Sequence, residues 1–364
     1  SYKELGYVSS PIRVLVVDDS AFTRKIISDM LNSEPDIVVV DVARNGKIGV
    51  EKARSLKPDV ITLDVEMPVM NGLEALEVIM REIPTPVVML SAMTQEGATT
   101  TFRALEMGAV DFVPKPSGSI VLSVDEIHDM LLEKVRLAAK VKVRPRKVGY
   151  RPDRRPMRPD QLKAARERPP RREERFRSVV IIGTSTGGPS ALNRVLPDLP
   201  KDIPAGILVV QHMPPGFTKS LAARLNDACA IGVKEAEEGD GIEQGKALVA
   251  PGGKHMVVKA SGKVRLSNAP PRNGVRPAID NTMESAVDIY GKNLIGVVLT
   301  GMGRDGAEGM AAIKASGGKT IAEHESTCVI YGMPRAVIEQ GLADLIVPLH
   351  EMGEAITRSV QETE

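Results

Sequence analysis

The chain of 364 residues contains no tryptophan, only two cysteines, and so few aromatic side chains that they make up 3% of the sequence. This scarcity argues against a protein whose main task is to stack on bases or sugars. Cys229 and Cys328 are too few for a disulfide framework, and no group of cysteines and histidines has the spacing of a zinc site. The composition therefore favours a reducing compartment, and we expect a cytoplasmic protein.

Long apolar runs are also missing. No run approaches the roughly 20 residues that a membrane-spanning helix needs, and the N-terminal residues have no apolar signal-peptide core. Hydrophobic residues make up 42% and charged residues 26% of the chain, as in soluble globular proteins. A chain of this length is sufficient for two domains with their own cores. We therefore expect two domains and no insertion into a membrane.

Residues 12 to about 122 alternate between short apolar runs and helical patterns. The runs predict five strands, at 12–17, 37–42, 60–63, 87–90 and 110–113. Helices are expected at 23–31, 48–56, 73–80, 99–107 and 124–139. This alternation predicts a doubly wound α/β domain with a parallel sheet, whose functional site lies at the carboxyl ends of the strands.

Chemically active residues follow these strands: Asp18 and Asp19, Asp64, Ser91 and Lys115. Three carboxylates at adjacent strand ends would repel one another unless they shared a hard divalent cation such as Mg²⁺. Asp64 can then attack a phosphoryl donor, while Lys115 pairs with the resulting phosphate and the Ser91 hydroxyl hydrogen-bonds it. Each aspartate alone could instead be a loop or helix-capping residue. Five such residues at strand ends together favour a phosphorylation site.

Four motifs in this domain resemble those of bacterial two-component receiver domains, which have a flavodoxin-like fold. They are DDS at 18–20, TLDVEMPVMNG at 62–72, SAMT at 91–94 and DFVPKP at 111–116. The resemblance implies that Asp64 is the phospho-acceptor. It also implies that Mg²⁺ is bound by Asp18, Asp19, Asp64 and the backbone carbonyl of Glu66.

The same resemblance places Ser91 at the switch-hydroxyl position, Phe112 at the switch-aromatic position and Lys115 beside the phosphate. It suggests a cis peptide bond between Lys115 and Pro116, as receiver domains keep at this position. It also implies that a histidine kinase supplies the phosphoryl group. We assign residues 12–140 to the receiver domain.

Residues 141–177 contain 15 Lys/Arg and 5 Asp/Glu, a net charge of +10; since the whole chain carries +1, the remainder carries −9. The segment is rich in proline and has almost no large aliphatic residues, so it cannot bury enough apolar surface to fold by itself. We interpret it as an extended, basic tether. A docking strip for acidic partners or nucleic acid is the alternative, because its arginines are dense.

Residues 178–364 again alternate between strand and helix patterns. Strands are expected at 179–182, 207–210, 294–299, 320–322 and 345–347. Helices are expected at 190–196, 218–228, 279–290, 307–315, 335–340 and 351–361. Between residues 233 and 267, short runs separated by glycines look like a small antiparallel excursion. The segment predicts a second doubly wound domain, with a mostly parallel sheet.

The run SVVIIGTSTGGPSAL at 178–192 joins a strand to a helix through a glycine-rich turn. Gly183, Ser185 and Gly187 have the G-x-S-x-G spacing of a nucleophile elbow, and Pro189 suits the first turn of the helix. Such a turn presents one side chain away from the backbone, and the helix start can hold an anion. The motif alone does not establish a nucleophile, because a turn that cradles a phosphate can have the same residues.

Two further strands of this domain end at chemically active residues. His212 follows the strand at 207–210, and Asp305 lies in a glycine-rich turn after the strand at 294–299. A serine, a histidine and an aspartate at one edge of a sheet are what a Ser–His–Asp triad needs. Their order, Ser…His…Asp, differs from that of α/β-hydrolases. His324 follows another strand and is the alternative base.

Six motifs of this domain resemble those of the chemotaxis protein-glutamate methylesterases, and the order receiver, linker, catalytic domain matches that family. The motifs are GTSTGGPSAL, VVQHMP, APGGKH, RPAID, LTGMGRDGAEGM and YGMPRAV. The resemblance implies that Ser185 is the nucleophile, His212 the base and Asp305 the orienting acid. It assigns the backbone N–H of Met302 to the oxyanion hole. Four further residues belong to motifs that line the cleft: Thr184, Thr186, Gly187 and Arg276.

The family implies a phosphorylation-activated enzyme that hydrolyses glutamyl methyl esters on chemoreceptors, releases methanol and deamidates receptor glutamines. Mg²⁺ is expected in the receiver domain and no cofactor in the esterase site. Two other functions remain as alternatives: a DNA-binding response regulator, suggested by the receiver and the basic linker, and an interaction module without activity. The first requires a helix-turn-helix output domain, and the second requires a degenerate triad. Neither feature is apparent in the sequence, and we expect no nucleic acid partner.

Overall fold

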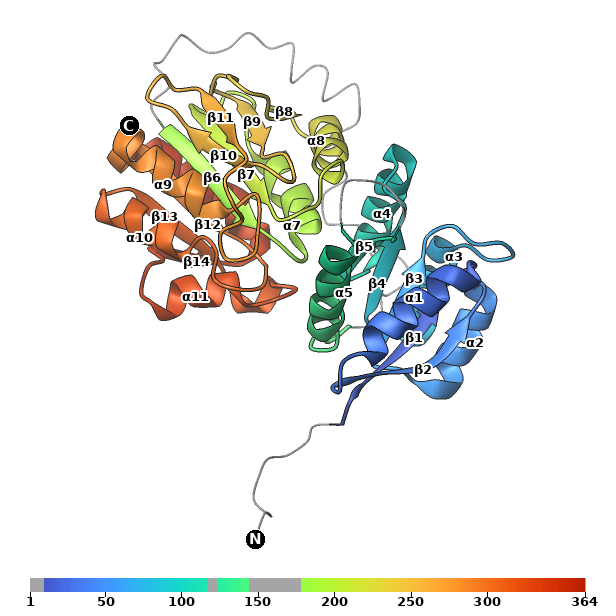
Figure 1. Cartoon of the computed structure of the whole chain (residues 1–364). Coiled ribbons are helices and arrows are strands. Elements are labelled where there is room, and N and C mark those ends of the chain that lie inside the picture. Colours follow the sequence, from blue (N-terminus) through green and yellow to red (C-terminus); the bar gives the residue numbers. More distant parts are fainter. Residues whose placement is uncertain (1–9, 117–122, 144–177, 364) are drawn as a thin grey trace. The chain divides into compact units, whose positions relative to one another are not determined.

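The computed structural model describes residues 10–116, 123–143 and 178–363 (Figure 1). The chain divides into two compact units, Ser1–Tyr150 and Arg151–Glu364. All but three residues of the expected linker, 141–177, lie outside the described segments. No helix within the described segments is long and apolar enough to cross a membrane.

The first unit is built on a five-stranded parallel sheet with the strand order β2-β1-β3-β4-β5. Helix α1 packs on α5, while α3 packs on α2 and α4, so the helices form two layers. The apolar runs that predicted β3 and β4 are buried and those of β1 and β5 nearly so, whereas the edge strand β2 is only partly buried. In chain order the elements are β1 (Ile12–Val17), α1 (Ala21–Asn32), β2 (Ile37–Ala43), α2 (Gly46–Leu56), β3 (Val60–Asp64), α3 (Gly72–Glu82), β4 (Val87–Ser91), α4 (Gln95–Met107), β5 (Asp111–Pro114) and α5 (Val124–Ala138).

The second unit is built on a seven-stranded sheet with the order β14-β13-β12-β6-β7-β9-β8, in which every pair is parallel. A separate antiparallel pair is formed by β10 and β11. The strands are β6 (Ser178–Thr184), β7 (Ala205–Gln211), β8 (Gly232–Glu235), β9 (Lys246–Val249), β10 (His255–Val258), β11 (Val264–Ser267), β12 (Leu294–Val298), β13 (Lys319–Glu323) and β14 (Leu345–Val347).

Helix α10 packs on α9 and on α11, and α7 packs on α8. The helices are α7 (Gly188–Val195), α8 (Phe217–Ala228), α9 (Ile279–Tyr290), α10 (Ala307–Ala315), α11 (Met333–Glu339) and α12 (Met352–Glu362), with short 3₁₀ turns η1 (Leu196–Asp198), η2 (Gly291–Asn293), η3 (Glu325–Thr327) and η4 (Leu349–Glu351). This architecture confirms the predicted doubly wound domain. The described part of the second unit is therefore an α/β domain and not the helix-turn-helix domain that a DNA-binding regulator would need.

The predicted antiparallel excursion is smaller than we expected. Strands β10 and β11 form it, but β8 and β9 pair in parallel and extend the main sheet beyond β7. The short, glycine-bounded runs at 232–235 and 246–249 show that a strand is present, but not which strand it pairs with. The peptide bond between Lys115 and Pro116 is not cis, contrary to the expectation from the receiver resemblance. Within the described residues, the cis bond lies between Arg276 and Pro277.

Candidate active site

Three neighbouring strands of the second sheet, β12, β6 and β7, bring the predicted catalytic residues to one edge. Ser185 follows β6 directly, His212 follows β7, and Asp305 lies in the turn between β12 and α10. Because β6 pairs with both β7 and β12 in parallel, the carboxyl ends of the three strands meet. Residues separated by more than a hundred positions in sequence are thereby gathered at the edge where α/β proteins place their sites.

Ser185 occupies the turn between β6 and α7, as a nucleophile elbow requires. Its N–H donates to the carbonyl of Thr300 at 3.0 Å, and its own carbonyl accepts from the N–H of Gly188 at 2.8 Å. The side-chain amide of Gln211 donates to the carbonyls of Ser185 and His212, both at 3.0 Å. These bonds fix the backbone that carries Ser185 relative to the backbone that carries His212.

His212 and Asp305 form a close pair. The Nε2 atom of His212 lies 2.7 Å from Oδ2 of Asp305, and their side chains are 11% and 4% exposed. Nδ1 is therefore the imidazole nitrogen left to serve a nucleophile. Within the described residues no hydrogen bond joins the Ser185 hydroxyl to His212. Such bonds are often long without substrate and shorten when it binds.

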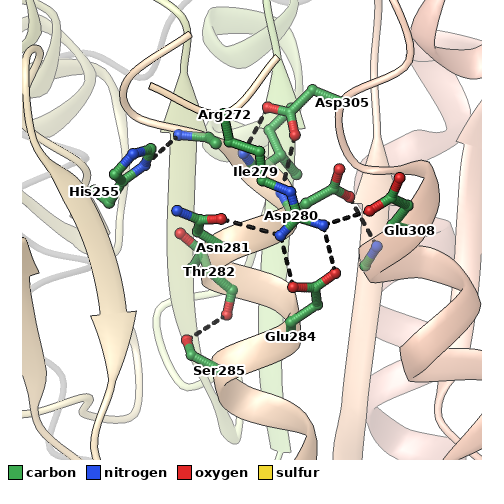
Figure 2. Close-up of polar contacts among 12 residues, drawn as sticks. His255, Arg272, Ile279, Asp280, Asn281, Thr282, Glu284, Ser285, Asp305 and Glu308 are labelled. Carbon is green, nitrogen blue, oxygen red and sulfur yellow. Dashed lines mark hydrogen bonds and ion pairs between the residues drawn. The ribbon is translucent and has the colours of Figure 1, made fainter. Parts of the chain in front are cut away.

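The carboxylate of Asp305 is held by the start of helix α9 (Figure 2). Its Oδ2 accepts from the N–H of Ile279 at 2.7 Å, and its Oδ1 accepts from the N–H of Asp280 at 3.1 Å. Burial alone would raise the pKa of Asp305, but the hydrogen bond and charge of His212 and these N–H donors outweigh it and lower that pKa. His212 and, to a lesser extent, the helix N-terminus thus favour the ionised form of Asp305, the form that can balance a histidine cation.

The loop after β12 lies against the nucleophile turn. A Cβ placed on Gly301 would lie 2.7 Å from Cβ of Ser185, so only glycine permits this approach. The N–H of Gly301 donates to the carbonyl of Ile330, and its carbonyl accepts from the N–H of Met333 at 2.8 Å. Met302 is 39% exposed, and within the described residues its N–H makes no hydrogen bond. A donor of this kind is available to an oxyanion.

The weaker cleft candidates have mostly structural contacts. Thr184 and Thr186 are buried, and the Thr184 hydroxyl donates to the carbonyl of Thr300 at 3.0 Å. Gly187 has φ +81° and precedes α7, and a Cβ there would meet Val329 at 2.7 Å. Arg276 is half-buried, and its guanidinium donates to the backbone carbonyls of Asn268 and Ala269.

His324, the alternative base, lies farther from Ser185 in the sheet order. It follows β13, which is separated from β6 by β12, whereas His212 follows β7, the direct neighbour of β6. The Nδ1 atom of His324 lies 2.8 Å from the Ser326 hydroxyl and caps the short 3₁₀ turn η3. The ring is exposed and has no aspartate partner within the described residues, so the geometry favours His212.

The first unit has an acidic site at the carboxyl edge of its own sheet. Carboxylate oxygens of Asp18, Asp19 and Asp64 lie within 4.8 Å of one another, an arrangement that fits a divalent cation. Lys115 Nζ lies 2.9 Å from Oδ2 of Asp18 and 2.7 Å from Oδ2 of Asp64. Burial raises the pKa of Asp64 to about 6; the bond to Lys115 opposes this rise and the charge of Asp18 adds to it.

The other predicted receiver residues lie at or near this edge. Ser91 is fully buried at the end of β4, and its hydroxyl accepts from the Thr101 hydroxyl at 2.6 Å. Phe112 is buried in β5, with Lys134 Nζ 5.6 Å from its ring centre. Glu66 is exposed two residues after Asp64, in the turn that follows β3.

Sequence reasoning missed several residues that organise the esterase edge. The side-chain amide of Gln211 joins the loops that carry Ser185 and His212. The Thr300 hydroxyl connects its own loop to the turn that carries Ser185 and to the backbone of Ile330. Buried Glu323 accepts from the N–H of Thr300 at 2.8 Å. Asp280 lies buried beside Asp305. A buried polar residue at or near a strand end was the available signal for Gln211 and Glu323, whereas the position of Asp280 depends on how two helices pack.

The fold and the two sites define a response regulator: a receiver domain is joined to an α/β domain whose strand ends carry serine, histidine and aspartate. Comparison with family models agrees, because residues 14–125 match the response regulator receiver domain and residues 180–356 match the CheB methylesterase.

Proteins that match almost the whole chain identify the family. The chain is 52% identical to the protein-glutamate methylesterase/protein-glutamine glutaminase of Symbiobacterium thermophilum, over 98% of this chain and 99% of that protein. It is 50% identical to the protein of the same name from Pyrococcus abyssi, over 96% and 94%. The chain belongs to the protein-glutamate methylesterase/protein-glutamine glutaminase family. The solved CheB methylesterase catalytic domain of Thermotoga maritima is 48% identical, with a TM-score of 0.49 and coverage of 50% of this chain and 97% of that one.

Proposed function

We propose that this chain is a phosphorylation-activated methylesterase that hydrolyses glutamyl methyl esters on chemoreceptors and releases methanol. We also propose that it deamidates receptor glutamines, because the same acyl chemistry applies to an amide. What supports the proposal is the edge formed by the adjacent strands β12, β6 and β7, after whose ends Asp305, Ser185 and His212 lie, in a chain whose relatives have this activity in their names.

The proposed reaction begins when the Ser185 hydroxyl adds to the ester carbonyl while His212 accepts its proton. The backbone N–H of Met302 donates to the oxyanion of the tetrahedral intermediate, which is often the largest catalytic contribution. His212 returns the proton to the departing methoxide, so methanol leaves and a glutamyl-serine ester remains. His212 then activates a water molecule, which releases the glutamate side chain and restores Ser185.

Asp305 acts in this mechanism through the imidazole. Its bond to Nε2 holds the ring with Nδ1 directed to the nucleophile and stabilises the imidazolium formed when Ser185 attacks. The N–H groups at the start of α9 add to the effect of His212 in favouring ionised Asp305, so this carboxylate can balance the positive charge that His212 gains.

The receiver domain is proposed to take a phosphoryl group from a histidine kinase onto Asp64. Asp18, Asp19 and Asp64, with the carbonyl of Glu66, would hold Mg²⁺, which supplies charge neutralisation for the incoming phosphoryl oxygens. Lys115 already contacts Asp64 and would pair with the phosphate, and the Ser91 hydroxyl would turn to hydrogen-bond it. Phosphorylation then raises the activity of the esterase domain.

The experiment is methanol release from membranes that contain methylated receptors. Wild type, Ser185→Ala and Asp64→Asn are compared, each with and without a small phosphodonor and Mg²⁺. We expect wild type to be active and stimulated, Ser185→Ala to be inactive, and Asp64→Asn not to be stimulated. Full activity in Ser185→Ala would refute the nucleophile. Stimulation that survives in Asp64→Asn would refute the switch.

A further inference from the structure

Asp280 is a buried carboxylate that the proposed mechanism does not use. It is 1% exposed and belongs to the first turn of α9, next to the N–H groups that bind Asp305. Its Oδ1 accepts from the N–H of Gly309 at 2.8 Å. Gly309 lies in the first turn of α10, the helix that directly follows Asp305 and Gly306. Asp280 therefore connects the two helices whose N-termini converge on the site.

The two helices cap each other. Neither α9 nor α10 has a side-chain cap from its own N-cap residue, which is Ala278 for α9 and Gly306 for α10. Instead Asp305, from the segment before α10, accepts from the first N–H groups of α9, and Asp280, from α9, accepts from the first turn of α10. Each carboxylate thus supplies the acceptor that the other helix lacks.

Close packing and a shared arginine hold this arrangement together. A Cβ on Gly309 would lie 2.5 Å from Cβ of Met283, so glycine lets α10 approach α9 closely enough for its N–H to reach Asp280. Arg272 donates to Glu284 of α9 and to Glu308 of α10, and so joins the two helices beside the crossed caps (Figure 2).

We propose that Asp280 is a positioning residue of the esterase site, which orients Asp305 toward His212 through the crossed helix caps and adjusts by its charge how strongly Asp305 holds the imidazolium. The inference rests on the proposed function, because it assumes that His212 and Asp305 act in catalysis. Its geometric basis is the pair of hydrogen bonds that run in opposite directions between the two helix starts.

The charge of Asp280 can vary near neutral pH. Burial raises its pKa to about 7; the bond from Gly309 opposes the rise, and the negative charge of Asp305 adds to it. Arg272, whose charge favours ionised Asp280, is itself paired with Glu284 and Glu308. The groups that face Asp280 are thus Asp305 on one side and Arg272 with its two glutamates on the other. Ionised Asp280 places a second negative charge beside Asp305.

The test compares two variants of the full-length protein. Asp280→Ala removes the acceptor for α10, whereas Asp280→Asn keeps a carbonyl acceptor and removes the charge. We expect Asp280→Ala to lower kcat roughly tenfold or more with little change in KM, because Asp305 loses its orientation. We expect Asp280→Asn to keep most of kcat and to move the acidic limb of the kcat/KM profile down by about half a pH unit, because a neighbouring negative charge is gone.

Thr282→Val is the matched control, since it removes another buried hydrogen bond of α9, from the Thr282 hydroxyl to the carbonyl of Met256 at 2.6 Å. It should lower thermal stability and leave kcat and the pH profile unchanged. Ser185→Ala is measured in parallel, because its activity tests the proposed function separately.

The inference fails if wild type is active, Ser185→Ala is inactive, and both Asp280 variants keep the wild-type kcat and pH profile. It also fails if Thr282→Val reproduces the kinetic changes, since the effect would then be general destabilisation. If Asp280→Ala does not fold, a wild-type pH profile in Asp280→Asn refutes the role of the charge, and a shifted profile supports it.

Discussion

Each domain places a pair of buried aspartates at the carboxyl edge of its sheet, but the two pairs are neutralised differently. Asp18 and Asp64 contact the ammonium of Lys115, and Asp19 lies close enough to share a cation with them. Asp280 and Asp305 are held by backbone N–H groups of two helices and by His212. In each pair burial raises the pKa of one member, Asp64 to about 6 and Asp280 to about 7.

The difference fits the roles that we propose for the two pairs. A lysine side chain can move and a cation can exchange, so the first pair suits a site whose charge changes when a phosphoryl group arrives. Helix N-termini are fixed dipoles that do not leave, so the second pair suits a site whose geometry has to stay constant through every turnover. The contrast can be tested by altering the neutralising groups.

The largest loss of activity is expected at the pair Asp280 and Asp305, which is held by helix dipoles. Asp305→Asn should lower kcat by about 10³- to 10⁴-fold, because an amide neither stabilises the imidazolium nor fixes its tautomer. Methanol release measures this loss. The control is Asp344→Asn, which removes the charge that pairs with Lys314 at 2.6 Å near the edge strand β14 and should retain activity. Comparable losses in the two variants would contradict a special role for Asp305.

A smaller loss is expected from Glu323, which supports the loop that carries Met302. Glu323→Ala leaves the buried N–H of Thr300 without its acceptor, and we expect kcat to fall about 10- to 100-fold as the loop shifts. Glu323→Gln keeps a carbonyl acceptor and should retain most of the activity. If both variants lost activity equally, the charge of Glu323 rather than its hydrogen bond would be required.

Asp18 and Asp64 are neutralised by Lys115. The variant Lys115→Met should bind Mg²⁺ about tenfold more tightly, because the ammonium no longer competes for these carboxylates. Isothermal titration calorimetry measures the change. Lys134→Met is the matched control: it removes the same charge from an ion pair with Asp111, 2.7 Å away, and should leave Mg²⁺ affinity nearly unchanged. Unchanged affinity in Lys115→Met would mean that Lys115 does not compete with the cation.

The smallest effect is a pH-dependent difference in stability between wild type and Asp280→Asn. The folded-state pKa of Asp280 is raised above its ordinary value, so the folded protein binds this proton more tightly than the unfolded chain does. That contribution to stability is complete at pH values below about 4 and is lost as the pH rises through about 7. Scanning calorimetry from pH 5 to 8 should show wild type losing about a few degrees in Tm relative to Asp280→Asn. A constant difference would contradict the raised pKa.

Much of this molecule could be predicted from local pattern. Continuous apolar runs identified the strands of the first sheet and five strands of the second, because central strands buried on both faces carry no alternation. Ser185, His212 and Asp305 were predicted as a triad because each lies after such a run, and the sheet topology places the three strand ends side by side. Strands β8 and β9 were wrongly assigned to the antiparallel excursion, since a run of four residues does not specify the strand with which it pairs. Asp280 was missed because cross-capping arises only when α9 and α10 pack, which no local pattern encodes.

The gathering of the esterase residues on three adjacent strands has a consequence for folding. Strand β6 is flanked by β7 and β12, and no two of these strands supply the serine, the histidine and the aspartate together. Strand β12, which precedes the turn that holds Asp305, follows β7 by more than eighty residues, so its pairing with β6 closes a long loop. If the proposed triad acts, ester hydrolysis reports the completed assembly of the sheet centre, and we expect a nascent or nicked chain to gain activity only when β12 has docked against β6.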